Sequence, residues 1–167
     1  FLFFARPAPP SPEPIRIVQL VDEAAFLLAL EMEDFGISYR QEIAEDLNGL
    51  GDPEQIKRAL FNLMKNAVQA MRNGGELLVK GIRFGDEVVV EVGDTGPGMS
   101  PEVQERLFEP FFSTKEKGSG LGLAIVRQTV EKNGGRVELR SRVGFGTNFK
   151  IALPAHDPGP HPEEDAG

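Results

Sequence analysis

Four short motifs lie in a fixed order along this 167-residue chain, and they constrain which folds are possible more than any other feature of the sequence. They are NLMKNA at residues 62–67, DTGPGM at 94–99, FEPFFSTK at 108–115 and GSGLGL at 118–123. Glycine-rich loops and asparagine-bearing helices are each common. Because chance rarely produces all four at this spacing, we expect the fold to bring them together at one nucleotide site.

Apolar residues at helical spacing, together with helix start signals, predict the helices. Asp52 before Pro53 is typical of a capped helix start, and Asn73-Gly74-Gly75 is typical of a helix end. Ser100 before Pro101 repeats the start signal. The expected helices lie at residues 17–28, at residues 53–73, in a short stretch after Ser100 and at residues 120–132.

Apolar residues at alternating positions, and turn residues between them, predict strands. We expect strands at residues 37–43, 76–83, 87–92, 136–141 and 147–153. Strands gathered beside a few helices favour the α+β class. The predicted architecture is a two-layer α/β sandwich, in which helices cover one face of the sheet and the other face is polar.

Charge and composition exclude several classes of protein. The formal net charge of −8 argues against nonspecific nucleic-acid binding, which needs clustered Lys and Arg. No apolar run is long enough to cross a bilayer, and the opening FLFF is too short for a signal peptide. The absence of cysteine fits a reducing compartment. We therefore expect a cytoplasmic domain without direct membrane contact.

Composition also predicts the domain boundaries. Residues 7–14 (PAPPSPEP) are typical of an extended linker, so residues 1–13 are assigned to the segment before the domain. The folded domain is expected at residues 14–154. Residues 155–167 are rich in Pro, Gly and acidic residues and predict a disordered tail.

The first motif places Asn62 and Asn66 on one helix face, because residues four apart are neighbours on a helix. A carboxamide oxygen at this position could ligate Mg²⁺, which takes oxygen ligands and borrows others from water and phosphates. Alternatively, both asparagines only solvate the helix. The residues alone leave both interpretations open.

The second motif places Asp94 after an apolar strand and before Gly96 and Gly98. A carboxylate there could accept a hydrogen bond from an exocyclic amine such as that of adenine. The two glycines would let the backbone approach a flat base. The alternative is an ordinary aspartate-glycine turn.

The last two motifs suggest a phosphate loop and a lid. Gly118, Gly120 and Gly122 precede and open a helix, where unpaired N–H groups can hold anions. Their spacing partly matches a dinucleotide fingerprint, which the lack of a surrounding βαβ unit disfavours. Residues 100–117 form a long connection that could be a mobile lid, with Lys115 or Lys117 reaching the phosphates. The phenylalanines Phe108, Phe111 and Phe112 either dock this lid or belong to the core.

At these residues the chain resembles the GHKL ATP-binding superfamily, and within it the catalytic domain of bacterial sensor histidine kinases. The four motifs resemble the N, G1, F and G2 boxes of that family, and residues 146–149 resemble its closing G-T-x-F segment. The sequence NLMKNAVQAM, together with FFSTK, is most similar to sensor kinases of the nitrogen-regulation type. The resemblance implies the Bergerat fold, a mixed sheet of about five strands backed by three helices.

The resemblance also implies a set of site residues for ATP and Mg²⁺. It makes Asn62 and Asn66 the catalytic positions, with Asn66 as the metal ligand, and it assigns the adenine amino group to Asp94. It places Thr147 on the adenine side of the pocket and Lys115 among the candidates for the phosphates. The remaining implied nucleotide-binding residues are Gly96, Gly98, Met99, Gly118, Gly120, Leu121 and Gly122.

The reaction implied is transfer of the γ-phosphoryl group of ATP to a histidine of a dimerisation domain, from which a response regulator receives it. In related ATPases a glutamate activates water one turn before the metal-binding asparagine, and here that position holds Asn62. An amide cannot accept a proton at neutral pH, so transfer is favoured over hydrolysis. A GHKL ATPase, an anti-sigma-type serine kinase and a catalytically silent nucleotide-binding module remain alternatives.

The chain departs from the family pattern at two places. No histidine precedes the N box, so the phosphoacceptor is expected on a dimerisation domain of the same protein, and residues 1–6 (FLFFAR) resemble the end of one of its helices. Gln69 occupies a place where several relatives carry a basic residue. Because family dimers form through the dimerisation helices, we expect this part to be monomeric.

Overall fold

The computed structural model describes residues 8–112 and 122–156 of the chain. Helices and strands follow the predicted order, with two additional short strands near the N-terminus. In chain order they are β1 (Glu13–Arg16), α1 (Ile17–Phe35), β2 (Ile37–Ile43), β3 (Asn48–Gly51), α2 (Pro53–Ala70), β4 (Gly75–Phe84), β5 (Glu87–Asp94), α3 (Pro101–Arg106), α4 (Gly122–Lys132), β6 (Arg136–Arg142) and β7 (Gly146–Pro154).

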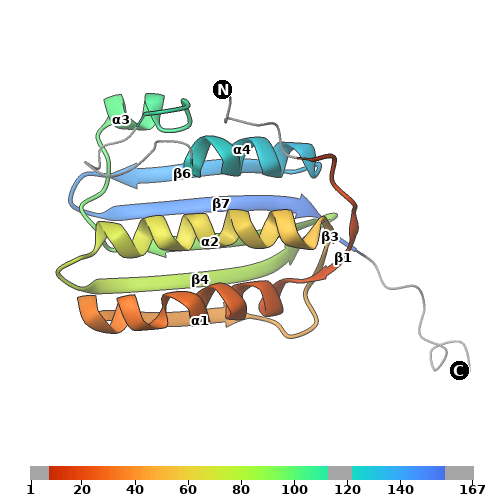
Figure 1. The fold of residues 1–167 in the computed structure, drawn as a ribbon, viewed down its shortest axis with the longest axis horizontal. Helices are drawn as coiled ribbons and strands as arrows, with labels where there is room; N and C mark the ends of the chain where they lie inside the picture. Colours follow the sequence, from red (N-terminus) through yellow and green to blue (C-terminus); the bar gives the residue numbers. More distant parts are fainter. Residues whose placement is uncertain (1–7, 113–121, 157–167) are drawn as a thin grey trace, which may run out of the picture.

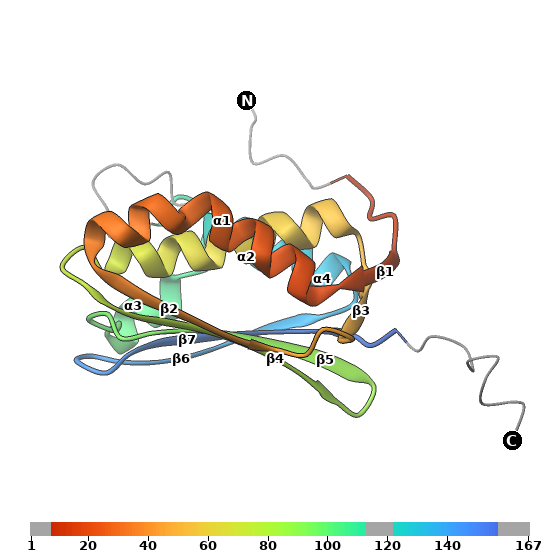
Figure 2. The same ribbon diagram turned by 90° about the horizontal axis from the view of Figure 1, so that it is seen from below.

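The main sheet has five strands in the order β2-β4-β5-β7-β6. β2 and β4 pair in parallel, whereas the other neighbours pair antiparallel, so the sheet is mixed. The helices α1, α2 and α4 lie side by side on one face of this sheet, and α3 lies beside the end of β6 (Figures 1 and 2). This is the two-layer α+β sandwich with three backing helices that was predicted.

Local signals explain where the two long helices begin and end. The Asp52 carboxylate accepts hydrogen bonds from the N–H groups of Glu54 and Gln55 at 3.1 and 3.2 Å, and Pro53 occupies the first helical position of α2. α1 ends at Gly36, which has a φ of 71° and closes the helix in the left-handed conformation. The Asp52-Pro53 start was predicted, whereas the Gly36 end was not, and α1 continues past residue 28, where the predicted helix ends.

Alternation along the strands separates an apolar face from a polar one. On β5, Val88, Val90 and Val92 are buried beneath the helices. The positions between them face away from the helices, and there Glu91 pairs with Lys150 of β7 at 3.1 Å. The sheet therefore has one covered face and one polar face, as predicted.

The structure extends the prediction at both ends of the domain. β1 and β3 pair with each other antiparallel and were not predicted, because β1 lies in a proline-rich stretch and β3 reads NGLG. At the other end, the Ala155 N–H donates to the Asp86 carbonyl at 2.8 Å and the His156 N–H to the Asn48 carbonyl at 3.1 Å. The assignment of residues 1–13 and 155–167 to other segments stays a prediction.

Within residues 8–112 and 122–156, none of the helices combines the length and the apolarity that a membrane span requires.

Candidate functional site

Asp94 is the last residue of β5, opposite Thr147 of β7. It has the same parity as Val92, so its half-buried side chain lies on the side of the sheet that the helices cover. The Asp94 carboxylate accepts a hydrogen bond from the Gly96 N–H at 2.9 Å. Burial raises the pKa of Asp94, while the backbone N–H groups of Gly96 and Thr147 act in the opposite direction. The result is an oriented, partly desolvated hydrogen-bond acceptor.

The loop after Asp94 lies against the C-terminal end of α2. A side chain at Gly96 would place its Cβ 3.4 Å from the Ala70 carbonyl and 3.0 Å from the Asp94 carboxylate. Thr95 fixes the start of the loop, since its Oγ1 accepts from the Glu76 N–H at 2.9 Å. The loop therefore stays close to both β5 and α2, the elements that carry the second and first motifs.

The β6–β7 hairpin holds the other end of this loop. Gly98 has a φ of 73°, and a Cβ there would lie 2.0 Å from the Arg142 carbonyl. Beside it, the Gly144 N–H donates to the Pro97 carbonyl at 2.8 Å. A glycine is thus required at Gly98 for two separate reasons, its left-handed backbone and the close approach of the hairpin.

Two polar residues that were not predicted complete the loop's attachment. The Ser141 hydroxyl accepts from the Met99 N–H at 2.8 Å and lies 2.8 Å from the Thr147 hydroxyl. The Gln104 side-chain amide donates to the Met99 carbonyl at 2.8 Å and to the Ser141 carbonyl at 3.0 Å. The only sequence signal for Ser141 is its position across a hairpin from Thr147, and Gln104 has none.

Asn62 and Asn66 lie one turn apart on α2, and both are half-buried at the edge of its buried stripe. Gly96 lies against Ala70 in the last turn of the same helix, so the second motif lies beside the helix that carries the first. Among the described residues, no group of three or more His, Cys, Asp or Glu could hold a metal ion. A single carboxamide oxygen fits Mg²⁺, which takes most of its ligands from water and phosphates.

The structure describes only part of the third and fourth motifs. Phe108 packs edge-to-face on Phe149 with ring centroids 6.3 Å apart, whereas Phe111 is 70% exposed. Phe108 is therefore part of the core and Phe111 is not. Gly122 is the exposed first residue of α4. The predicted phosphate and lid residues Lys115, Lys117, Gly118, Gly120 and Leu121 lie outside the described residues.

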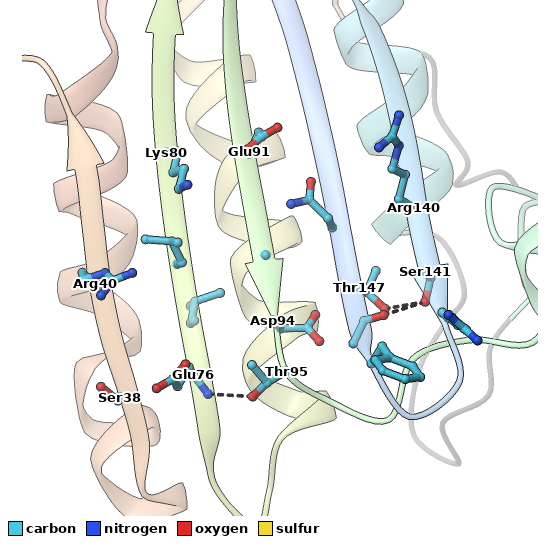
Figure 3. A pocket seen from close by; sticks show the side chains of 17 residues that line it. Ser38, Arg40, Glu76, Lys80, Glu91, Asp94, Thr95, Arg140, Ser141 and Thr147 are labelled. Carbon is cyan, nitrogen blue, oxygen red and sulfur yellow. Dashed lines mark hydrogen bonds between the residues drawn. The ribbon is translucent and has the colours of Figure 1, made fainter.

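A hollow of about 530 Å³ lies on the other face of the sheet, and Asp94, Ser141 and Thr147 are among the residues that line it. Figure 3 shows it with the helices behind the strands, and Arg40, Lys80 and Arg140 reach into it from β2, β4 and β6. Asp94 and Thr147 therefore border both faces at this end of the sheet, whereas Asn62, Asn66 and Gly96 do not line the hollow. The first and second motifs share only the helix-covered face, and we place the nucleotide site there.

Comparisons with known proteins agree with this geometry. The family described as histidine kinase-, DNA gyrase B- and HSP90-like ATPases matches residues 51–157. The chain is 32% identical over 157 residues to Sporulation kinase E of Bacillus subtilis, covering 92% of this chain and 21% of that protein. It is 30% identical over 172 residues to the nitrogen regulation protein NtrY of Azorhizobium caulinodans, covering 98% and 22%.

Solved structures give the same result. The catalytic domain of histidine kinase ThkA superposes with a TM-score of 0.78 at 30% identity, covering 86% of this chain and 95% of that one. Full-length ShkA in complex with AMPPNP superposes with a TM-score of 0.80 at 31% identity, covering 89% and 32%. The chain spans about a fifth of the length of the two curated relatives and nearly all of the ThkA domain.

Proposed function

The chain belongs to the family of histidine kinase-, DNA gyrase B- and HSP90-like ATPases, and we propose that it binds Mg²⁺-ATP as the catalytic domain of a sensor histidine kinase. In this proposal it transfers the γ-phosphoryl group of ATP to a histidine of a dimerisation domain. A response regulator then receives the group, and the domain acts in the cytoplasm. The single observation that supports the proposal most is the Asp94 carboxylate, held at the end of β5 beside α2.

Asp94 supports binding of adenine. Its carboxylate already accepts from Gly96 and is partly shielded from water, so a further hydrogen bond from an amino group would form in a low-dielectric setting. Gly98 and Met99 keep the adjoining loop against β6–β7, and Gly96 lies against the end of α2. Thr147 adds a hydroxyl from the neighbouring strand. The neighbour ShkA, solved with AMPPNP, fits a nucleotide in this class of domain.

Asn66 is the proposed metal ligand. When bound, Mg²⁺ supplies charge neutralisation to the phosphates during phosphoryl transfer. Asn66 contributes one neutral oxygen from α2, which leaves the remaining ligand positions to water and phosphate oxygens. The proposed phosphate contacts are the backbone of Gly118, Gly120, Leu121 and Gly122 together with Lys115.

Asn62 supports transfer rather than hydrolysis. It is half-buried on α2 one turn before Asn66. A carboxylate at this place could take a proton from water, but the carboxamide cannot do so at neutral pH. Phosphoryl transfer therefore depends on an acceptor brought to the site and on its positioning.

The test supplies γ-labelled ATP and Mg²⁺ to the chain together with histidine-bearing dimerisation fragments. Label on a fragment that is lost in acid and kept in base supports the proposed transfer. Free phosphate released at the same rate with and without fragments would instead show an ATPase. A fragment whose histidine is replaced by glutamine is the matched control, and it should stay unlabelled.

A further inference from the structure

The outer face of α1 exposes three large apolar side chains. Phe26 is 82% exposed, Leu27 68% and Leu30 71%. Phe26 and Leu30 lie one turn apart and Leu27 is next to both, so the three form one surface, here called the α1 patch. Contiguous apolar surfaces of this kind commonly mark interaction sites.

A groove continues from the α1 patch toward α2. It has a volume of about 560 Å³, and its apolar floor comes from Phe26 and Leu27 of α1 and Phe61 of α2. Figures 1 and 2 both show α1 and α2 side by side at this edge of the helical layer. An apolar groove between two helices can accept the apolar stripe of a third helix.

The charged side chains of α1 itself are all acidic, whereas α2 contributes Lys57 and Arg58 to the groove. α1 carries five carboxylates and no lysine or arginine: Asp22, Glu23, Glu31, Glu33 and Asp34. Two of them have partners, since Glu23 lies 3.6 Å from Lys57 and Asp22 accepts from Gln41 at 2.7 Å. Glu33 and Asp34 form no ion pair with any described residue. The C-terminal end of α1 beside the patch is therefore acidic, while the groove toward α2 carries charges of both signs.

The position of Glu33 and Asp34 at the end of α1 further favours a cation. The last turn of α1 holds Glu33 and Asp34, where the partial negative charge of a helix C-terminus favours cations instead. Acidic side chains there destabilise the isolated helix slightly. A cation from a binding partner would interact favourably with the helix end and with both carboxylates at once.

We propose that the α1 patch binds an amphipathic helix of a protein partner, with apolar residues at i, i+3 or i+4, and i+7 and with lysine or arginine beside them. A second copy of this chain fits less well, because it would bring the same carboxylates together. An anionic membrane surface would likewise be repelled. The proposal uses no residue of the nucleotide site and stands apart from the proposed function.

The test uses two synthetic helical peptides of about 18 residues, which match the length of α1. Both have a leucine stripe; one has lysine beside it and the other glutamate. Calorimetry at about 0.15 M salt reduces nonspecific attraction to the acidic protein. We expect the lysine peptide to bind and the glutamate peptide not to bind. Equal binding of both peptides would overturn the proposal.

Variants then locate the binding. Phe26→Ser with Leu30→Ser should weaken binding of the lysine peptide about tenfold or more, because apolar burial is lost. The control pair Ile82→Ser with Phe84→Ser, which changes exposed residues of β4, should leave binding unchanged. Glu33→Gln with Asp34→Asn should weaken it several-fold. An equal loss of peptide affinity in the control pair would contradict the proposal. Self-association of the chain that is abolished only by the Phe26 and Leu30 changes would also contradict it, because a second copy would then occupy the α1 patch.

Discussion

At the scale of single residues, the environment of Asp94 supports the proposed function. Its carboxylate is held by the Gly96 N–H at 2.9 Å, and its half-buried position makes ionisation unfavourable relative to water. A residue needed only for folding would be more stable as a neutral side chain. A charged acceptor at this position is better explained by recognition of a hydrogen-bond donor.

Asp94→Asn should weaken binding of ADP about tenfold or more, because a charge-assisted hydrogen bond is worth about 1.5–3 kcal/mol. Isothermal titration calorimetry measures this directly. The control is Asp86→Asn, which changes an exposed carboxylate in the β4–β5 turn and should leave affinity unchanged. Wild-type affinity in Asp94→Asn would show that the base does not bind at this carboxylate.

The pKa of Asp94 also predicts how stability changes with pH. Because burial raises the pKa, the folded chain holds this proton more tightly than the unfolded chain does. The free energy of unfolding due to Asp94 is greatest below the unfolded pKa of about 3.9 and falls as pH rises through it toward the folded pKa. Denaturant unfolding should show wild type losing stability relative to Asp94→Asn over this range. A relative gain would mean that the hydrogen bonds outweigh burial.

Asn66→Ala should weaken binding of a nonhydrolysable ATP analogue about tenfold in Mg²⁺, since the metal loses its protein ligand. The same variant should bind almost as wild type in EDTA, where no metal bridge exists. Asn73→Ala, an exposed change just after α2, is the control. Losses of equal size with and without Mg²⁺ would assign Asn66 a different role.

At the scale of elements, the β6–β7 hairpin and α3 hold the loop that follows β5. Ser141 binds the Met99 N–H, Gln104 binds the Met99 carbonyl, and the Gly144 N–H binds the Pro97 carbonyl. Three hydrogen bonds from two separate elements therefore fix one loop at backbone atoms. We infer that the shape of the proposed adenine pocket depends on this attachment as much as on the motif itself.

Gly98→Ala should destabilise the fold more than Gly144→Ala, although both glycines have positive φ. At Gly98 a Cβ would lie 2.0 Å from the Arg142 carbonyl, whereas at Gly144 it would meet nothing within 4 Å. Backbone strain alone costs about 1–2 kcal/mol in each case, so the difference isolates the close approach. Thermal unfolding measures it, and ADP affinity should fall only in Gly98→Ala. Equal destabilisation by Gly98→Ala and Gly144→Ala would mean that the β6–β7 hairpin moves to accommodate the added Cβ.

At the scale of the whole molecule, the sequence allowed prediction of most helices and strands but not of their arrangement. Asp52-Pro53 and the apolar stripe predict α2 because both signals are local. The short strands β1 and β3 could not be predicted, because they are stabilised by each other across more than thirty residues of chain. The parallel pairing of β2 with β4 likewise depends on α2 crossing between them.

The same distinction between local and long-range signals applies to the candidate site. Asp94, Gly96 and Gly98 were predicted from their motif, because a strand end followed by glycines is a local pattern. Ser141 and Gln104 were missed, since their contacts with Met99 arise only when the hairpin and α3 meet the loop. Residues that act through tertiary contacts with backbone atoms leave no pattern in a single sequence.

Two faces of the sheet compete as the place where a nucleotide binds, and one measurement distinguishes them. Backbone amide shifts of the isotope-labelled chain are recorded during titration with Mg²⁺ and AMPPNP. We predict the largest changes at Asn62, Asn66 and Gly96, on the face that the helices cover, with further changes at Asp94 and Thr147, which border both faces. Changes confined to Arg40, Lys80 and Arg140, around the hollow on the open face, would contradict the proposed site.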